Sequence, residues 1–225
     1  MPRDESHHAL KVLRVSPPDV VTVTDGRGVV ARCAAVRVEG DLLVAEVLER
    51  DVHRRPRPEL VVYQGAAKGA KADEVVEKLA ELGVAEVRVY ESKRSVARWD
   101  DAKVARLNER WEAITRSAAK QSRNPFVTHA VAGLSWSQVV DEIGREPLPV
   151  VLWEEATLPL RTALLDGVER IAFVVGPEGG LEPAEAEALA RAGAQLVSLG
   201  PHILRTENAA LVTAAAVLSR YGAIG

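Results

Sequence analysis

A continuously apolar run that ends in a turn almost without side chains is the feature that most constrains this chain. Residues 171–175 (IAFVV) form the run, and residues 176–180 (GPEGG) follow it directly. Such a run is typical of a strand buried on both faces, as in a parallel sheet covered by helices. Glycine is needed where backbone dihedrals are unusual or where another atom must lie on the main chain. The pattern predicts an α/β fold, with either a ligand site or a tight structural turn at the end of this strand.

The rest of the chain after residue 57 alternates short apolar runs with helical periodicity. Strands are predicted at residues 60–63, 87–90, 150–153, 171–175 and 196–199. Helices are predicted at residues 73–82, from about 101, from Pro183, and at 206–221, with Gly83 and Gly193 as helix stops. Strands separated by helices favour one covered, mainly parallel sheet.

The N-terminal part has a different pattern of apolar and polar residues. Residues 19–49 alternate apolar and polar residues around two hairpin signals, Asp25-Gly26 and Gly40-Asp41. Residues 53–59 (HRRPRPE) place two prolines among charges and read as a linker. The sequence therefore predicts two domains, a β-rich one at residues 1–56 and an α/β one at residues 57–225. Cys33 falls in the alternating segment and is expected to be a small buried residue.

Composition excludes several classes of protein. The chain has 225 residues and a net charge of -3, and it contains one cysteine, so it cannot form an internal disulfide. No apolar run approaches the roughly 20 residues that cross a bilayer, and the N-terminus lacks the apolar stretch of a signal peptide. These features predict a soluble cytoplasmic protein. The five scattered histidines predict no metal site.

Charge is unevenly distributed along the chain. Residues 88–123 contain ten Lys or Arg against five Asp or Glu, whereas residues 136–200 contain four against eleven. The basic stretch includes a stripe on the helix predicted from about 101, at Arg116, Lys120 and Arg123. The pattern alone leaves two interpretations open, a surface that faces a polyanion and an ordinary solvated helix face.

A second irregular loop follows the strand predicted at residues 196–199. It combines apolar Leu199, Ile203 and Leu204 with the polar residues 205–207 (RTE), the mixture expected of a small-molecule pocket. The first turn matches neither G-x-G-x-x-G nor G-x-x-x-x-G-K-[ST], and its glutamate repels phosphate. The dinucleotide and nucleoside-triphosphate interpretations therefore lose their usual support, and the kind of ligand stays open on these grounds.

These two loops carry a family resemblance. VVGPEGGLEPAE together with SLGPHILRTENAAL resembles the knotted SPOUT class of S-adenosylmethionine-dependent RNA methyltransferases, specifically the RsmE-type enzymes that methylate N3 of a uridine in small-subunit ribosomal RNA. The likeness extends through AAKGAKADEVVEKLAELGVAEV, ESKRSVARW, RWEAITRSAAKQSRNPFV and HHALKVLRVSPPDVVTVTDGRG, nearly the whole chain. Two departures stand out. The family usually has a β segment ahead of the HHALKVLR-like stretch, so the first strand of the N-terminal domain is expected to be missing, and Asn208 replaces a threonine.

The resemblance implies a small PUA-like β-barrel domain followed by a SPOUT domain whose C-terminal segment forms a trefoil knot. It also implies a homodimer that acts on small-subunit ribosomal RNA, in the assembled 30S subunit. The implied cofactor, S-adenosyl-L-methionine, is held by the knot loops. By motif match its site comprises Leu152, Trp153, Glu154, Gly176, Glu178, Gly179, Gly180, Leu199, Gly200, Ile203 and Leu204.

The resemblance also indicates candidate residues for catalysis and RNA binding. Glu207, or a water that it orients, is predicted to accept the uridine N3 proton while Arg205 stabilises the charge on the uracil oxygens. The alternative is that Glu207 caps the last helix and Arg205 forms a structural ion pair. Predicted RNA phosphate contacts are Arg14, Lys68, Lys71, Arg94, Arg98, Arg116, Lys120 and Arg123.

Two rival functions remain open at this point. One is a knotted methyltransferase that acts on another RNA, such as a transfer-RNA base or a ribose oxygen. The other is a non-catalytic RNA-binding factor in ribosome assembly that keeps the pocket without turnover.

Overall fold

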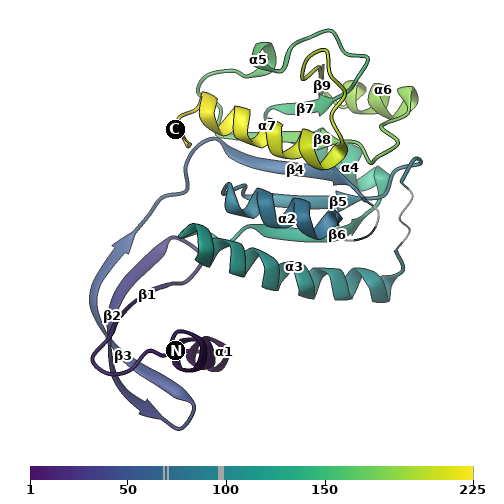
Figure 1. Cartoon of the computed structure of the whole chain (residues 1–225). Helices are drawn as coiled ribbons and strands as arrows, with labels where there is room; N and C mark the ends of the chain where they lie inside the picture. Colours follow the sequence, from purple (N-terminus) through teal and green to yellow (C-terminus); the bar gives the residue numbers. More distant parts are fainter. Residues whose placement is uncertain (68, 70, 96–98, 225) are drawn as a thin grey trace. The chain divides into compact units, whose positions relative to one another are not determined.

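The computed structural model describes residues 1–67, 69, 71–95 and 99–224 (Figure 1). Internal contacts divide the chain into two compact units, Met1–Arg55 and Pro56–Gly225. The larger unit contains, in chain order, β4 (Glu59–Gly65), α2 (Lys71–Glu81), β5 (Glu86–Tyr90), α3 (Asp101–Ser122), β6 (His129–Leu134), α4 (Trp136–Ile143), β7 (Pro149–Leu152), α5 (Leu160–Ala163), β8 (Arg170–Val175), α6 (Pro183–Arg191), β9 (Gln195–Val197) and α7 (Thr206–Arg220).

One parallel sheet of six strands organises the larger unit. The strand order is β6-β5-β4-β8-β7-β9, and every neighbouring pair is parallel. Helices α2, α3 and α7 cover the face turned to the viewer in Figure 1, and α4 and α6 lie behind the sheet. The predicted α/β class is confirmed. Helices lie on both faces because the apolar strands of a parallel sheet must be shielded from water on both sides.

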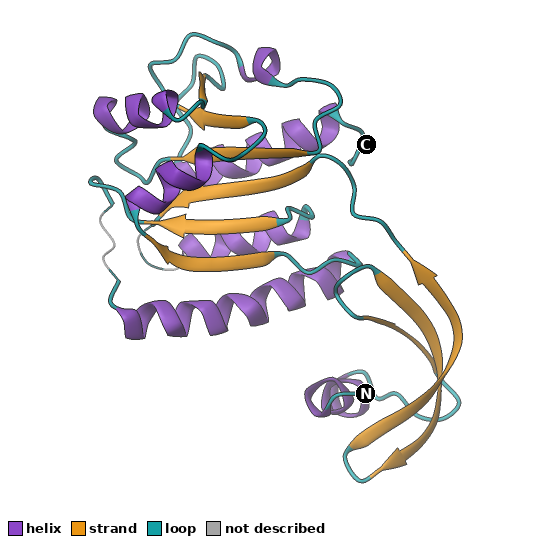
Figure 2. Cartoon of the chain, turned by 180° about the vertical axis from the view of Figure 1, so that it is seen from behind, coloured by secondary structure: helices purple, strands orange, loops and turns teal. Residues whose placement is uncertain are grey.

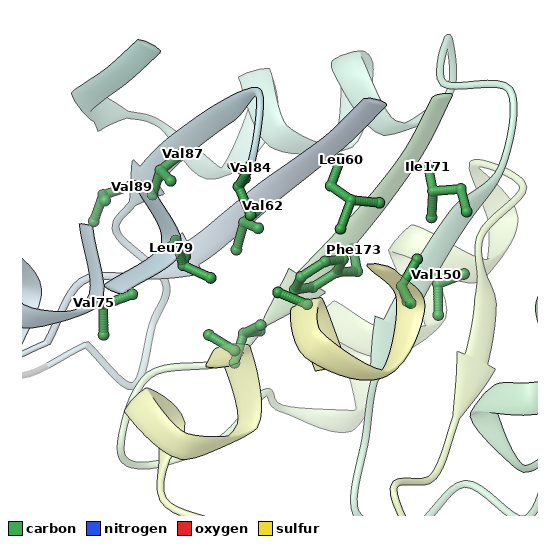
Figure 3. Close-up of a cluster of buried hydrophobic side chains, with 14 of the residues drawn as sticks. Leu60, Val62, Val75, Leu79, Val84, Val87, Val89, Val150, Ile171 and Phe173 are labelled. Carbon is green, nitrogen blue, oxygen red and sulfur yellow. The ribbon is translucent and has the colours of Figure 1, made fainter. Parts of the chain in front are cut away.

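The central strands are buried on both sides, as their apolar sequences require. In β4, Leu60 and Val62 pack under α2 and α7, whereas Val61 and Tyr63 pack on the opposite face. Figure 3 shows the first of these clusters, in which Leu79 of α2 lies close to Val62 and Phe173 of β8 lies among the strands. Trp111 of α3 is fully buried in the same cluster. Its indole N–H donates to Asp73 of α2 at 2.8 Å.

The predicted elements agree with the structure except for β6 and for the ends of β7 and β9. Pro183 opens α6 as predicted, and Gly193 follows its end with φ +106°. β6 was not predicted, because this edge strand is only partly buried and contains Gly133 at φ +89°. The strands predicted at 150–153 and 196–199 end earlier, since Trp153 and Ser198 already belong to loops that build the cavity described below.

The end of β9 is enclosed by the segment that follows β7. The Trp153 N–H donates to the Val197 carbonyl at 3.0 Å on one side of the strand. On the other side the Ser198 N–H donates to Leu158 at 2.8 Å, and Leu160 donates to Ser198 at 3.1 Å. From there the chain continues into α7, which packs on α2, β4 and β8. The trefoil knot that the resemblance implies stays a prediction.

The N-terminal unit is a three-stranded antiparallel sheet in the order β1-β2-β3, with two helical turns before it. Its elements are α1 (Arg3–His7), the π-helical turn η1 (His8–Val12), β1 (Val20–Thr24), β2 (Val29–Glu39) and β3 (Leu42–Val52). Gly26 and Gly40 occupy the two hairpin turns with φ +71° and +58°, as the sequence predicts. Cys33 is buried, also as predicted. Figure 2 shows the strands of this unit in orange and the helical segment near the N-terminus in purple.

Candidate functional site

A cavity of about 720 Å³ opens at the carboxyl edge of the parallel sheet. The ends of β7, β8 and β9 and the start of α7 supply its walls. This is the edge at which open α/β sheets bind ligands, and the volume lies in the range of small-molecule sites. All eleven residues that the resemblance assigns to the cofactor line it, together with Lys71, Ala156, His202, Arg205 and others.

The glycines of the turn after β8 are needed first for close packing within the protein. A Cβ at Gly65, the last residue of β4, would overlap the backbone of Pro177. A Cβ at Gly176 would lie 3.0 Å from the Gly180 carbonyl carbon, and one at Gly179 would lie 3.1 Å from Cβ of Arg94. The bare turn therefore allows β4, the turn itself and the loop after β5 to meet.

Gly180 connects this turn to an acidic wall of the cavity. Its φ is +70°, a conformation that favours glycine, and a Cβ there would meet Oε1 of Glu154 at 3.0 Å. Glu154 follows β7, and Glu178 belongs to the turn itself. Both residues line the cavity. Two carboxylates near a wall of backbone and aliphatic groups favour a cationic ligand and disfavour a phosphate.

The loop after β5 holds the turn at residues 176–180 in place through hydrogen bonds. Arg94 donates from Nη1 to the Gly179 carbonyl at 3.1 Å, and its side chain is 44% exposed. The Lys93 N–H donates at 3.0 Å to the buried carboxylate of Glu185, which also accepts from the Glu182 N–H at 2.9 Å. These bonds hold the turn and the start of α6 in one arrangement. Arg94, predicted as a phosphate contact, thus also positions the cavity wall.

A buried polar chain joins the two cavity loops. Gln64 of β4 is fully buried, and its Nε2 donates to Thr206 Oγ1 at 2.7 Å and to the Gly65 carbonyl at 3.0 Å. The Thr206 hydroxyl in turn donates to the Gly176 carbonyl at 2.5 Å. Since that hydroxyl has one proton, the chain has one direction, from Gln64 through Thr206 to Gly176. The sequence signal for Gln64 was a lone amide at the end of an apolar strand, and the predicted strand stopped one residue short of it.

The two candidate catalytic residues lie differently with respect to the cavity. Arg205 lines it, whereas Glu207 does not belong to the described lining residues. Glu207 Oε1 instead pairs with Nζ of Lys71 at 3.2 Å, and Lys71 lines the cavity. A hydrogen bond from its own backbone N–H is the main cause that lowers the pKa of the Glu207 carboxyl. Burial opposes this shift, and Lys71 and Arg205 add to it. Glu207 is therefore a carboxylate at neutral pH.

The predicted RNA contacts are spread over the chain. Arg116, Lys120 and Arg123 are exposed along one stripe of α3 and its end, and Arg116 pairs with Glu112 at 2.5 Å. Arg14 is exposed in the N-terminal unit with φ +56°. Lys68 and Arg98, also predicted, lie outside the described residues.

Two further properties concern only the described part of the chain. It contains no helix that is both long and apolar enough to span a bilayer. It also contains no group of three or more His, Cys, Asp or Glu side chains arranged to hold a metal ion.

Comparison with known families defines the class of protein. A model described as the RNA methyltransferase domain matches residues 53–218, and one described as the RNA methyltransferase PUA domain matches residues 2–48. The two models together cover most of both units. The chain is therefore an RNA methyltransferase, built from a PUA-like domain and an α/β domain.

Individual relatives specify the family. Ribosomal RNA small subunit methyltransferase E of Mycobacterium tuberculosis is 36% identical over 218 residues, which are 95% of this chain and 83% of that protein. The Bacillus subtilis protein of the same name is 30% identical over 222 residues, which are 95% of this chain and 87% of that protein. The crystal structure of the Neisseria gonorrhoeae protein of this name bound to S-adenosyl methionine gives a TM-score of 0.85 at 28% identity, covering 98% and 90% of the two chains. The chain belongs to the ribosomal RNA small subunit methyltransferase E family, as the sequence motifs predict.

Proposed function

We propose that this chain transfers a methyl group from S-adenosyl-L-methionine to N3 of a uridine in 16S ribosomal RNA. The observation that carries the proposal is the convergence of the two motif loops, residues 176–180 and 199–205, on one cavity. The loops are separated in the sequence by α6 and β9. A cavity of this size at the sheet edge is typical of a small-molecule site. The names of the relatives support ribosomal RNA as the substrate.

The residues around the cavity fit this cofactor. Leu152, Leu199 and Leu204 offer aliphatic carbons to the faces of an adenine, and the backbone of residues 176–180 offers groups to its edge. The carboxylates of Glu154 and Glu178 suit the ammonium and sulfonium charges, and S-adenosylmethionine has no phosphate for them to repel. When bound, S-adenosylmethionine supplies a methyl group attached to a positively charged sulfur. Uracil N3, which has lost its proton, bonds the methyl carbon, and the sulfur keeps the electron pair of the broken bond.

The chain's own contribution is to position the partners and to stabilise charge. The buried link from Gln64 to Gly176 holds both loops in place before substrate arrives, and such preorganisation is a large part of rate enhancement. Arg205 lines the cavity and is the candidate for stabilising negative charge on the uracil oxygens.

RNA binding and assembly belong to the same proposal. Exposed Arg116, Lys120 and Arg123 form a row suited to RNA phosphates, and Arg14 is a further contact from the N-terminal unit. The substrate is proposed to be the assembled 30S subunit in the cytoplasm. A homodimer is proposed through α7, whose outer face includes Val212, 46% exposed.

The test is direct methylation. Small subunits from a strain that lacks the modification are incubated with labelled cofactor, and the modified nucleotide is mapped by mass spectrometry, with naked 16S RNA as the comparison substrate. Methylation at a uridine N3 of 16S RNA is the expected result. Label in a ribose, no label in either substrate, or calorimetry without binding at millimolar cofactor would refute the assignment.

A further inference from the structure

The cavity is electrostatically polarised. Its acidic residues, Glu154 and Glu178, lie on the segments that follow β7 and β8. Its lysine and arginine, Lys71 and Arg205, come from the first turn of α2 and the residue before α7. A cationic methyl donor and a uracil that becomes anionic have opposite needs, so the acidic wall suits the donor and the basic edge suits the base.

Lys71 is held at this edge by Glu207. Its Nζ lies 3.2 Å from Glu207 Oε1, with the carboxylate side chain 16% exposed and the lysine side chain 38% exposed. The second oxygen, Oε2, is buried and has no hydrogen-bond partner among the described residues. A carboxylate left half unsatisfied costs stability. The ion pair with Lys71 therefore points to a role of Glu207 in orienting that lysine, and Lys71, unlike Glu207, is among the described residues that line the cavity.

We propose that Lys71 is a catalytic residue of the methyl transfer and that Glu207 is its positioning residue. The inference rests on the proposed function. The Lys71 ammonium donates to the uracil and stabilises the N3 anion that forms as the N3–H bond breaks and its proton leaves to solvent. Glu207 keeps the ammonium in place through its carboxylate. Arg205 then acts from the same edge as a second cation.

Several other charged groups pair with Lys71, lie near it in the sequence or line the same cavity. They are Arg205 and Glu207 at the start of α7; Asp73, paired with Arg110 of α3; Glu74, paired with Lys78; and the cavity residues Glu154, Glu178 and His202. They are common to the wild type and the Lys71 variants, so their contributions cancel when those rates are compared as a ratio at each pH.

The competing role for Lys71 is the RNA phosphate contact predicted from the sequence. The two roles differ in what they change. A phosphate contact contributes to substrate affinity and its salt dependence. A cation on the reacting base contributes to the rate of the chemical step, and its loss is compensated at alkaline pH, where hydroxide ionises more of the uridine N3.

The experiment measures single-turnover methylation at saturating subunit and cofactor over a neutral to alkaline pH range. Lys71→Met is expected to lower the rate roughly 100-fold near neutral pH, as removal of a charge-stabilising donor does, with a deficit that shrinks as pH rises. Lys71→Arg keeps the charge and is expected to keep the wild-type pH profile. Glu207→Gln should lose about tenfold. Lys78→Met on the exposed side of the same helix is the matched control, expected within twofold of wild type.

Calorimetry with cofactor and thermal unfolding establish that each variant is folded. A Lys71→Met variant with an unchanged rate, or with a deficit that is the same at every pH, would overturn the proposal, as would identical profiles for the methionine and arginine variants. If Lys71→Met does not fold, the Lys71→Arg and Glu207→Gln profiles decide, since loss of orientation alone must also produce a pH-dependent deficit. A wild-type chain that methylates no uridine would contradict the proposed function. An active wild type whose rate is unchanged by Lys71→Met would contradict only this inference.

Discussion

Replacing Thr206 with valine should remove the hydrogen bonds that link the two cavity loops. Valine keeps the shape of threonine but removes the hydroxyl that accepts from Gln64 and donates to Gly176. Two hydrogen bonds are lost, each with a net contribution of about 1 kcal/mol. The Gly176 carbonyl also loses this donor in a partly buried site. We expect the free energy of unfolding to fall by about 2–3 kcal/mol.

Urea unfolding followed by tryptophan fluorescence measures this loss of stability in the α/β unit, which contains Thr206. All four tryptophans belong to the segment Pro56–Gly225, so the signal reports the α/β unit. A shift of the midpoint at constant m-value is expected. Cofactor affinity should fall in parallel, because the loops no longer sit in one arrangement before binding.

Two matched variants make the reasoning refutable. Thr206→Ser keeps the hydroxyl and should cost less than about 1 kcal/mol. Thr213→Val lies on the same helix, where the Thr213 hydroxyl is buried and has no hydrogen-bond partner in the described part of the chain. Its removal should be neutral or stabilising. Equal losses for Thr206→Val and Thr213→Val would show that the polar link contributes nothing specific.

Three further outcomes are expected. Gly65→Ala should cost about 3 kcal/mol or more in thermal or urea unfolding, because its Cβ overlaps backbone, whereas Gly144→Ala, at φ -63° with 3.6 Å of clearance, should be nearly neutral. Glu86 contributes stability that is present above its unfolded pKa and is lost as pH falls through its lower folded pKa. Glu86→Gln should therefore flatten the decline of the free energy of unfolding between about pH 5 and 3. A decline as steep in the variant as in the wild type would contradict this. Arg116→Ala with Lys120→Ala should reduce the log–log salt slope of RNA binding by roughly 1.4 to 1.8, and an unchanged slope would remove both from the RNA surface.

The acid prediction depends on a network of charges on the sheet. Burial alone would raise the pKa of the Glu86 carboxyl. Hydrogen bonds and charges from Arg88 and Arg170 outweigh burial and lower that pKa below its ordinary value of 4.5. The guanidinium groups lie 2.6 Å and 3.0 Å from the carboxylate oxygens. Protonation of Glu86 in acid therefore weakens its pairs with Arg88 and Arg170.

Sequence patterns are sufficient for most of the elements and for the position of the cavity loops. Apolar runs such as residues 171–175 have no other stable place than a covered strand, and Pro183 and Gly193 bound a helix by local backbone chemistry. The edge strand β6 was missed, because a strand that is half exposed and interrupted by Gly133 has no strong periodic signal. The motif residues identified the cavity lining, including Leu152 and Leu204, through resemblance and not through spacing.

Tertiary structure alone decided what these residues touch. No local pattern indicates that Gly179 is bare because Arg94 packs on it, that Gln64 bonds a threonine 142 positions away, or that Glu207 pairs with the cavity-lining Lys71. Secondary structure follows from interactions a few residues apart, which a sequence displays directly. The identity of a side chain's partner depends instead on how the strands and helices cross at the sheet edge, which only the folded chain specifies.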